Sequence, residues 1–269
     1  MHQDLGKLSI DFALAARDLR DAFLASPDEG ARGSLFGALG ARRPYAGPSP
    51  EWRDRARIAA LPFRASLAEA DLARLGEDAG RIAFWTNLYN ALASLGVVEL
   101  GLRGRIERQP DFFYRTVMVS GGMRFCLEDI EQGLLRGNRS SPGWPFRPFG
   151  RRDPRASLAV REPDFRIHFA LDRCDASSPA FGTYEPASLG PALAAAEAAF
   201  AADWFRPDPA SRTVACARLF VNARRDFPGR WLGDPAYAGW KVSVLPHDGR
   251  VVPSRGPGGS EAGGEPSAR

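Results

Sequence analysis

The sequence predicts an α+β protein, in which a small, mostly antiparallel sheet packs against helices and a helical extension precedes the core. Long segments repeat apolar residues every three or four positions, as amphipathic helices do. Short segments alternate apolar and polar residues between turn-forming Gly, Ser and Pro, as strands do. Helical and strand-like segments are segregated along the chain, which favours α+β over alternating βαβ units.

Composition is that of a globular protein, with 44% hydrophobic and 25% charged residues among 269. This excludes a wholly disordered or collagen-like chain. We divide the chain into an N-terminal helical extension (residues 1–75), an α+β core domain (residues 76–252) and a tail (residues 253–269). Because the tail is rich in Gly, Pro, Ser and Glu, we expect it to be disordered.

Apolar periodicity predicts the helices. We expect them over residues 4–25, 51–61, 66–75, 81–95, 127–136 and 187–205. Ser66 and Glu69 form a candidate capping box for the third helix. The fourth helix is apolar around most of its circumference, which is typical of a buried central helix. Its Asn87 and Asn90 face nearly the same way and need partners, because an unmade buried hydrogen bond costs about 1–3 kcal/mol.

The strands are predicted from alternation and turns. Residues 115–119 and 123–126 form a hairpin around a Ser-Gly-Gly turn. The clearest strand covers residues 165–171, with Phe and Ile on one face and Arg166 and His168 on the other. Shorter strands are expected at residues 213–216 and 241–245. The proline-rich residues 28–50 and 138–164 are expected to be loops.

Several classes of function are excluded by composition. The net charge of +4 comes from scattered arginines, so we expect no nucleic-acid partner. No apolar run reaches the roughly 18 residues of a membrane-spanning helix, so we expect no membrane partner. Three widely spaced cysteines and three separated histidines indicate neither a disulfide framework nor a zinc site. We therefore expect a soluble cytoplasmic protein with no metal and no cofactor; its oligomeric state is not predicted.

The best candidate for chemistry is His168 with the turn that follows it. Cys174, Asp175, Ser177 and Ser178 lie in this turn, and together with a histidine they resemble a nucleophile and its base. The alternative is that His168 is a hydrogen-bonded sheet residue and that Asp and Ser serve only to form the turn. The sequence pattern alone leaves both interpretations open.

Seven short motifs carry a resemblance. They are Phe84-Trp85-Thr86-Asn87-Leu88-Tyr89-Asn90-Ala91, the block from Leu127 to Asn138, Asp153-Pro154-Arg155, Arg166-Ile167-His168-Phe169-Ala170-Leu171, Ser177-x-Pro179, Arg225-Asp226-Phe227 and Leu245-Pro246-His247-Asp248. In this order they resemble the signature blocks of the domain-of-unknown-function 547 family, over about residues 80–248.

The resemblance implies a thiol-hydrolase or transglutaminase-like chemistry, because members of the family usually pair a histidine in the second block with a cysteine in a Ser-Cys-Pro turn. A neighbouring imidazole activates such a thiol. This sequence departs at both places, with Gln132 for the histidine and Ser178 for the cysteine. It also has Arg173 in the place of another usual cysteine, and His247 where the family usually has an aromatic residue. Glutamine cannot shuttle a proton near neutral pH, and serine needs an efficient base.

Two hypotheses follow. The favoured one is a non-catalytic member that keeps a groove for a peptide or protein partner, with the candidate binding residues Trp85, Asn90, Arg166, Asp175 and His247. The alternative is a serine-based hydrolase or acyl transferase with the candidate catalytic residues Ser178, His168, Gln132 and Asn87, in which His168 or His247 is the base. A Ser178 Oγ within about 3.5 Å of an imidazole nitrogen would favour the enzyme. Trp85 as a core aromatic and the two asparagines as structural amides are the simpler interpretations of those residues.

Overall fold

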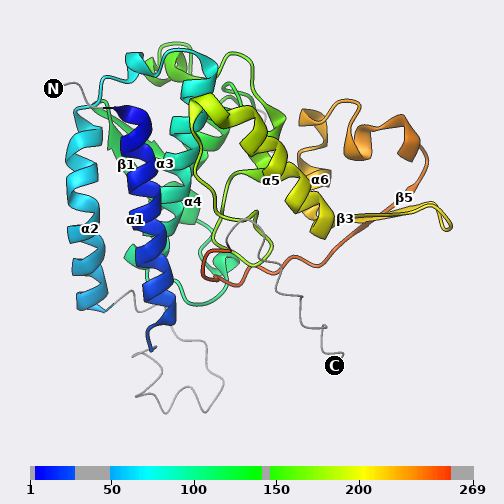
Figure 1. The fold of residues 1–269 in the computed structure, drawn as a ribbon, viewed down its shortest axis with the longest axis horizontal. Coiled ribbons are helices and arrows are strands. Elements are labelled where there is room, and N and C mark those ends of the chain that lie inside the picture. The colour runs from blue at the N-terminus through cyan, green and yellow to red at the C-terminus, as the bar shows by residue number, and fades with distance from the viewer. Residues whose placement is uncertain (1–3, 28–48, 141–145, 256–269) are drawn as a thin grey trace.

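A computed structural model describes residues 4–27, 49–140 and 146–255 (Figure 1). The α-helices are α1 (Leu5–Ala25), α2 (Pro50–Ala68), α3 (Asp78–Glu99), α4 (Phe112–Arg115), α5 (Leu189–Trp204) and α6 (Arg218–Asn222). The strands are β1 (Val117–Ser120), β2 (Met123–Cys126), β3 (Phe205–Asp208), β4 (Thr213–Cys216) and β5 (Lys241–Val244). A π-helix, η5 (Asp129–Leu135), follows β2. The 3₁₀ helices are η3 (Leu72–Leu75), η4 (Ile106–Arg108), η6 (Pro154–Leu158), η7 (Phe165–Phe169), η8 (Pro186–Ser188), η9 (Arg224–Asp226), η10 (Trp231–Gly233) and η11 (Pro235–Tyr237).

Helix α3 is the centre of the larger part of the molecule. Every residue from Ile82 to Val98 is buried, as the apolar pattern of this segment predicts. Helix α1 packs along α3, and α2 lies beside α1 (Figure 1). The Asp4 side chain caps α1 by accepting a hydrogen bond from the Lys7 amide at 3.1 Å. The helices predicted around residues 4–25, 81–95 and 187–205 are thereby confirmed as α1, α3 and α5.

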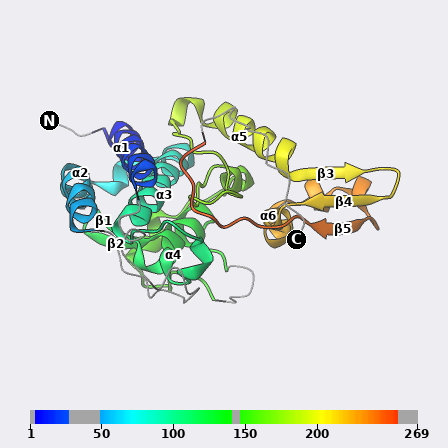
Figure 2. The same ribbon diagram turned by 90° about the horizontal axis from the view of Figure 1, so that it is seen from below.

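The strands form two small sheets at opposite sides of the molecule (Figure 2). Strands β1 and β2 form the predicted antiparallel hairpin, with Ser120 opposite Met123. In the second sheet β4 lies in the centre, antiparallel to β3 and parallel to β5. The predicted α+β class is confirmed, and the mostly antiparallel pairing with it.

Apolar side chains gather in two clusters. The larger one contains the buried faces of α1, α2 and α3 with the hairpin and η5. The smaller one is an aromatic cluster, in which Phe169 from η7 contacts Phe200 from α5 and Phe220 from α6 with ring centroids 5.6–5.7 Å apart. Because Ile167 belongs to the larger cluster and Phe169 to the smaller one, η7 joins the two.

The strand predicted at residues 165–171 is wrong. The segment is the 3₁₀ helix η7, which begins where the Asp164 carboxylate accepts a hydrogen bond from the Arg166 amide at 2.9 Å. Residues 167–172 are all buried, because this segment runs between the two apolar clusters. Apolar residues therefore occur on both sides of the segment. The alternation in its sequence reflects contacts with two apolar clusters and does not indicate a strand.

Two further predictions need correction. The helix predicted at residues 66–75 with its capping box does not exist, because α2 continues through Pro62 to Ala68 and places Ser66 inside it. A separate 3₁₀ helix then begins where Asp71 caps the Ala73 amide. The helix predicted at residues 127–136 is wound mainly as the π-helix η5. Most of the predicted loop at residues 28–50, and the predicted disordered tail from residue 256 onward, lie outside the described residues.

Within the described ranges, no helix is both long and apolar enough to cross a membrane.

Candidate functional site

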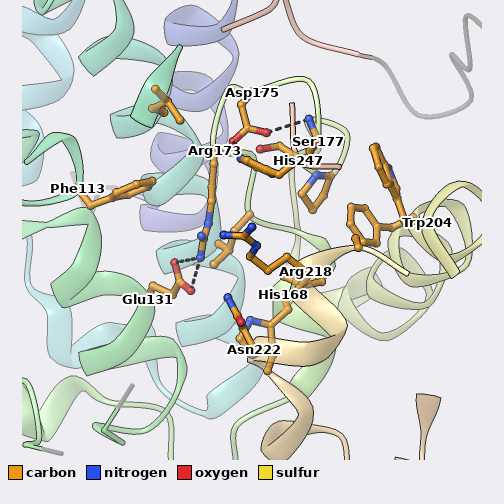
Figure 3. Close-up of a pocket in the computed structure, with 18 of the residues that line it drawn as sticks. Phe113, Glu131, His168, Arg173, Asp175, Ser177, Trp204, Arg218, Asn222 and His247 are labelled. Carbon is orange, nitrogen blue, oxygen red and sulfur yellow. Dashed lines mark hydrogen bonds and ion pairs between the residues drawn. The ribbon is translucent and has the colours of Figure 1, made fainter. Parts of the chain in front are cut away.

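A pocket of about 500 Å³ opens where the two apolar clusters meet (Figure 3). Its walls come from residues 106–113, η5, the turn after η7, the end of α5, α6 with η9, and residues 245–247. Five predicted site residues line it, although they come from segments far apart in the sequence: Gln132, His168, Asp175, Ser178 and His247. The volume is in the range of small-ligand sites, about 300–1,000 Å³.

The turn that carries Ser178 is held from two sides. On the core side, Arg20 of α1 donates a hydrogen bond to the Asp172 carboxylate at 2.8 Å. On the other side, the C-terminal segment pairs with the turn, as the Ala176 amide donates to the Arg250 carbonyl at 2.9 Å and the Ser177 hydroxyl accepts from the Asp248 amide at 2.8 Å. The turn is therefore fixed by contacts with both ends of the described chain.

The Ser178 hydroxyl is not arranged as a nucleophile. The residue is 4% exposed and its Oγ is buried. This atom forms no hydrogen bond of standard distance and angle with a described residue, but it lies close enough to the Asp175 carboxylate to lower the pKa of that group. An activated serine stands within about 2.6–3.2 Å of its base. Neither His168 nor His247 hydrogen-bonds to Ser178.

His168 lies at one end of the pocket in a closed ionic network. Its Nε2 is 2.7 Å from the Asp226 carboxylate, which also receives two hydrogen bonds from Arg136, at 2.7 and 3.0 Å. Arg136 in turn donates to the Gln132 side chain. Burial alone would raise the pKa of Asp226, but the hydrogen bonds from His168 and Arg136 lower this pKa well below its usual range. Asp226 is thus ionised and holds both partners.

His247 lies at the other end in a looser arrangement. Its Nε2 is 3.6 Å from the Glu107 carboxylate and 3.8 Å from that of Asp175, beyond hydrogen-bond distance. The His247 side chain is 35% exposed. Burial raises the pKa of Asp175, and His247 opposes this shift. The Asp175 carboxylate mainly forms the turn, by accepting a hydrogen bond from the Ser177 amide at 2.9 Å.

Two acidic residues and an arginine form the wall at η5. The Glu131 carboxylate accepts hydrogen bonds from Nη2 of Arg173 at 2.7 and 2.9 Å and from the Tyr89 hydroxyl at 3.3 Å (Figure 3). The Glu128 carboxyl group forms no hydrogen bond or ion pair with a described residue, although Arg173 and Arg136 are near enough to act on its charge. Burial and the nearby charge of Glu131 raise the pKa of Glu128 to about 7. Near neutral pH this pocket therefore contains a partly protonated carboxyl group.

Four predicted residues lie outside the pocket. Asn87 and Asn90 hold loop backbone: the amide of Asn87 bonds to the Tyr184 backbone in both directions at 2.8 Å, and that of Asn90 bonds to Ala170, Asp172 and Gly182. Trp85 is fully buried against Phe84 and Phe125. Arg166 forms an ion pair with its neighbour Asp164 at 2.6 Å. The structural interpretation of the two asparagines and of Trp85 fits these contacts.

The sequence interpretation missed several residues of the pocket. Arg218 and Asn222 belong to α6, a segment without a strong sequence pattern, whereas Trp204 ends the predicted helix α5, whose pattern does not indicate a pocket. Asp226 stands in the motif Arg225-Asp226-Phe227, so membership of this motif is the sequence signal that could have marked it as a site residue. Glu128, Glu131 and Arg136 stand in another.

The pocket offers charged and polar groups beside apolar side chains. In the described part of the chain, no group of three or more His, Cys, Asp or Glu side chains is placed to hold a metal ion. The arrangement combines guanidinium, carboxyl and imidazole groups with the apolar side chains of Phe113, Phe200 and Trp204, a combination that suits a ligand with both polar and apolar parts.

The model of the family described as "Protein of unknown function, DUF547" matches residues 73–201. No curated protein and no solved structure matches the chain. The matched range contains α3, η5, η7 and the Ser178 turn, and ends within α5.

Proposed function

The chain belongs to the DUF547 family of proteins of unknown function, and we propose that it is a non-catalytic member whose pocket binds a peptide segment of a protein partner. The observation that supports this most directly is the state of Ser178. Its Oγ is buried and has no imidazole partner, so the group in the nucleophile position lacks the access and the histidine base that a serine nucleophile uses.

The other groups near this position do not replace the missing chemistry. His168 uses its Nε2 for Asp226, and Gln132 carries no group that titrates near neutral pH. Cys174, the cysteine nearest to Ser178 in the sequence, is 1% exposed, and burial raises the pKa of its thiol to about 12. A thiol with such a pKa forms almost no nucleophilic thiolate at neutral pH.

Binding fits the shape and lining of the pocket. A space of about 500 Å³ whose lining mixes charged and polar groups with apolar side chains accommodates a short stretch of extended peptide, which presents both kinds of group. The scattered surface charge and the absence of a basic motif favour a protein partner over a nucleic acid. Three cysteines, none of them in a disulfide, fit a cytoplasmic setting.

A serine-based hydrolase or acyl transferase is the second candidate. It is favoured by one observation, namely that Ser178, His168 and His247 line the same pocket. In this alternative the Ser178 side chain turns toward one of the imidazoles when substrate binds, since catalytic hydrogen bonds can tighten only in the complex.

Two measurements test the proposal. Peptides selected from a random library on the intact protein should lose at least about ten-fold in affinity for Asn222→Trp, which fills the pocket, but not for Arg224→Trp, which lies outside it. Selected peptides that bind both variants equally well would contradict binding in the pocket. A fluorophosphonate probe should not label the wild type above background. Labelling that disappears in Ser178→Ala would instead establish the hydrolase.

A further inference from the structure

Most charged groups of the pocket neutralise one another. Arg136 pairs with Asp226 at 2.7 Å, and Arg173 pairs with Glu131 at 2.7 Å. At the His247 end, Glu107 is 3.3 Å from Arg105. A ligand that binds in this pocket therefore meets few groups whose charge is still uncompensated.

Arg218 is such a group. It is exposed, lines the pocket, and forms no hydrogen bond or ion pair with a described residue. Its side chain extends from the first residue of α6 into the pocket, toward Arg173 (Figure 3). Two guanidinium groups that point toward one another repel unless an anion lies between them.

Arg173 retains donors for such an anion. Only its Nη2 bonds to Glu131, and the guanidinium lies over the Phe113 ring with Cζ 5.5 Å from the ring centroid. The Nε and Nη1 groups form no hydrogen bond with a described residue. Its side chain is 40% exposed, which leaves these donors within reach of a ligand. Glu131 already holds the group in place, so little conformational freedom is lost when an anion binds.

The remaining carboxyl groups oppose an anion only weakly. Glu128 has a pKa of about 7 because of burial and of Glu131, so near neutral pH it is often uncharged. Glu107 lies beside His247. Asp175 is close enough to Arg173 to help raise the pKa of the guanidinium, while burial raises the pKa of the Asp175 carboxyl and so disfavours its charge.

Apolar residues adjoin the Arg218 side of the pocket. Trp204 stacks on Phe200 with ring centroids 6.2 Å apart, and Leu219 follows Arg218 in the chain. Leu245 and Pro246 complete this apolar wall. A ligand that combines an anionic group with an apolar side chain matches the two features together.

We infer that the peptide bound in this pocket presents a carboxylate to Arg218 and Arg173, with an apolar side chain against Trp204. The inference rests on the proposed function and specifies its ligand. Guanidinium groups bind carboxylates through paired N–H···O bonds, which gives both affinity and orientation. The carboxylate has two sources, the free C terminus of the partner or an Asp or Glu side chain.

Three synthetic peptides distinguish the sources. The first is acetyl-Ala-Ala-Leu with a free carboxylate, the second is the same peptide as its C-terminal amide, and the third is acetyl-Ala-Glu-Leu-amide. Binding is measured on the intact protein from ¹H–¹⁵N NMR shifts up to millimolar concentrations, which detects weak complexes. We expect the amide without Glu to bind at least about ten-fold more weakly than the free acid or the Glu peptide. Whichever of these two binds more tightly identifies the source.

Variants connect the effect to Arg218. Arg218→Gln should abolish the preference for a carboxylate, Arg218→Lys should keep part of it, and the exposed Arg224→Gln should leave it unchanged. The dispersion of the NMR spectrum verifies that each variant is folded. Equal binding of acid and amide, or a preference that survives Arg218→Gln, would overturn the inference; so would the absence of binding by all three peptides. The proposed function is tested separately: it fails if Asn222→Trp lowers the affinity of none of the library-selected peptides.

Discussion

The two ends of the pocket each place a histidine beside carboxylates, but they are built differently. At one end, His168, Arg136 and Asp226 are joined by hydrogen bonds of 2.7–3.0 Å, and the side chains are only 6–12% exposed. At the other end, His247 stands 3.6 and 3.8 Å from its two carboxylates and is 35% exposed.

The difference shows that proximity of a histidine and an acid does not define a catalytic pair. The His168 end joins segments 90 residues apart, since Arg136 follows η5 and Asp226 ends η9. It therefore acts as a structural connection between the two apolar clusters. The His247 end has few direct contacts, so its groups can reorient around a ligand at small cost.

The largest effect should come from breaking the closed network. Asp226→Asn removes the negative charge that holds Arg136 and His168, and leaves a mostly buried guanidinium without its counter-ion. Loss of one member of a buried pair costs about 3–5 kcal/mol, so we expect the free energy of unfolding to fall by about 3 kcal/mol at pH 7. Urea denaturation measures this change.

The matched variant at the open end is Asp175→Asn. The amide keeps the oxygen that accepts the Ser177 hydrogen bond, and it removes a charge whose burial is unfavourable. Its effect should stay below about 1 kcal/mol. Equal losses for the two variants would show that the ends do not differ.

The contribution of Asp226 should also depend on pH. Because the pKa of Asp226 is depressed in the folded state, the free energy that this carboxylate adds to folding should be lost progressively as the pH falls below about 4.

An intermediate effect is expected at Glu128, whose carboxyl group belongs neither to the hydrogen-bonded network of His168 nor to the looser contacts of His247. Its raised pKa of about 7 means that between about pH 4.5 and 7 the folded state keeps a proton that the unfolded chain releases. Stability therefore falls as the pH rises through this interval. Glu128→Gln removes the penalty, so at pH 8 we expect the variant to be about 1 kcal/mol more stable than the wild type.

The difference between Glu128→Gln and the wild type should vanish at pH 4, where both side chains are uncharged. Denaturation at the two pH values, with the exposed Glu51→Gln as a control, measures it. A constant difference across this range would show that Glu128 titrates normally.

Much of the fold follows from sequence because its strongest elements have local causes. The apolar pattern of α3 and the Gly-Gly turn of the hairpin determine these elements within a few residues. The segment of His168 was mispredicted because its apolar residues face two clusters, and only tertiary structure reveals the second. The π-helical winding of η5 could not be predicted either, because the spacing of its apolar residues is that of an α-helix.

The site was predictable where the residues share a motif or a turn. Asp175 and Ser178 lie in one turn, and Gln132 lies in a recognised block, so their candidacy could be stated in advance. Arg218 and Trp204 could not be placed, because they reach the pocket only through the packing of α5 and α6 in the aromatic cluster. Asn87, a candidate catalytic residue, and Asn90, a candidate binding residue, bond to loop backbone, which is what their simpler interpretation as structural amides predicts.

The smallest effect should come from His247, and it separates the two ends most sharply. His247→Gln removes a side chain that is 35% exposed and whose contacts with Glu107 and Asp175 exceed 3.5 Å. Exposed ion pairs contribute about 0–1 kcal/mol, and the long distance weakens the contact with the buried Asp175. We expect a change below about 0.5 kcal/mol in urea denaturation at pH 7. His168→Gln at the closed end should cost about 1–3 kcal/mol, because it removes a buried hydrogen bond to an ionised carboxylate. If His247→Gln lowered the free energy of unfolding as much as His168→Gln does, the His247 end would be a structural connection too. The groups around His247 would then not be free to reorient around a peptide, and this argument for binding there would fail.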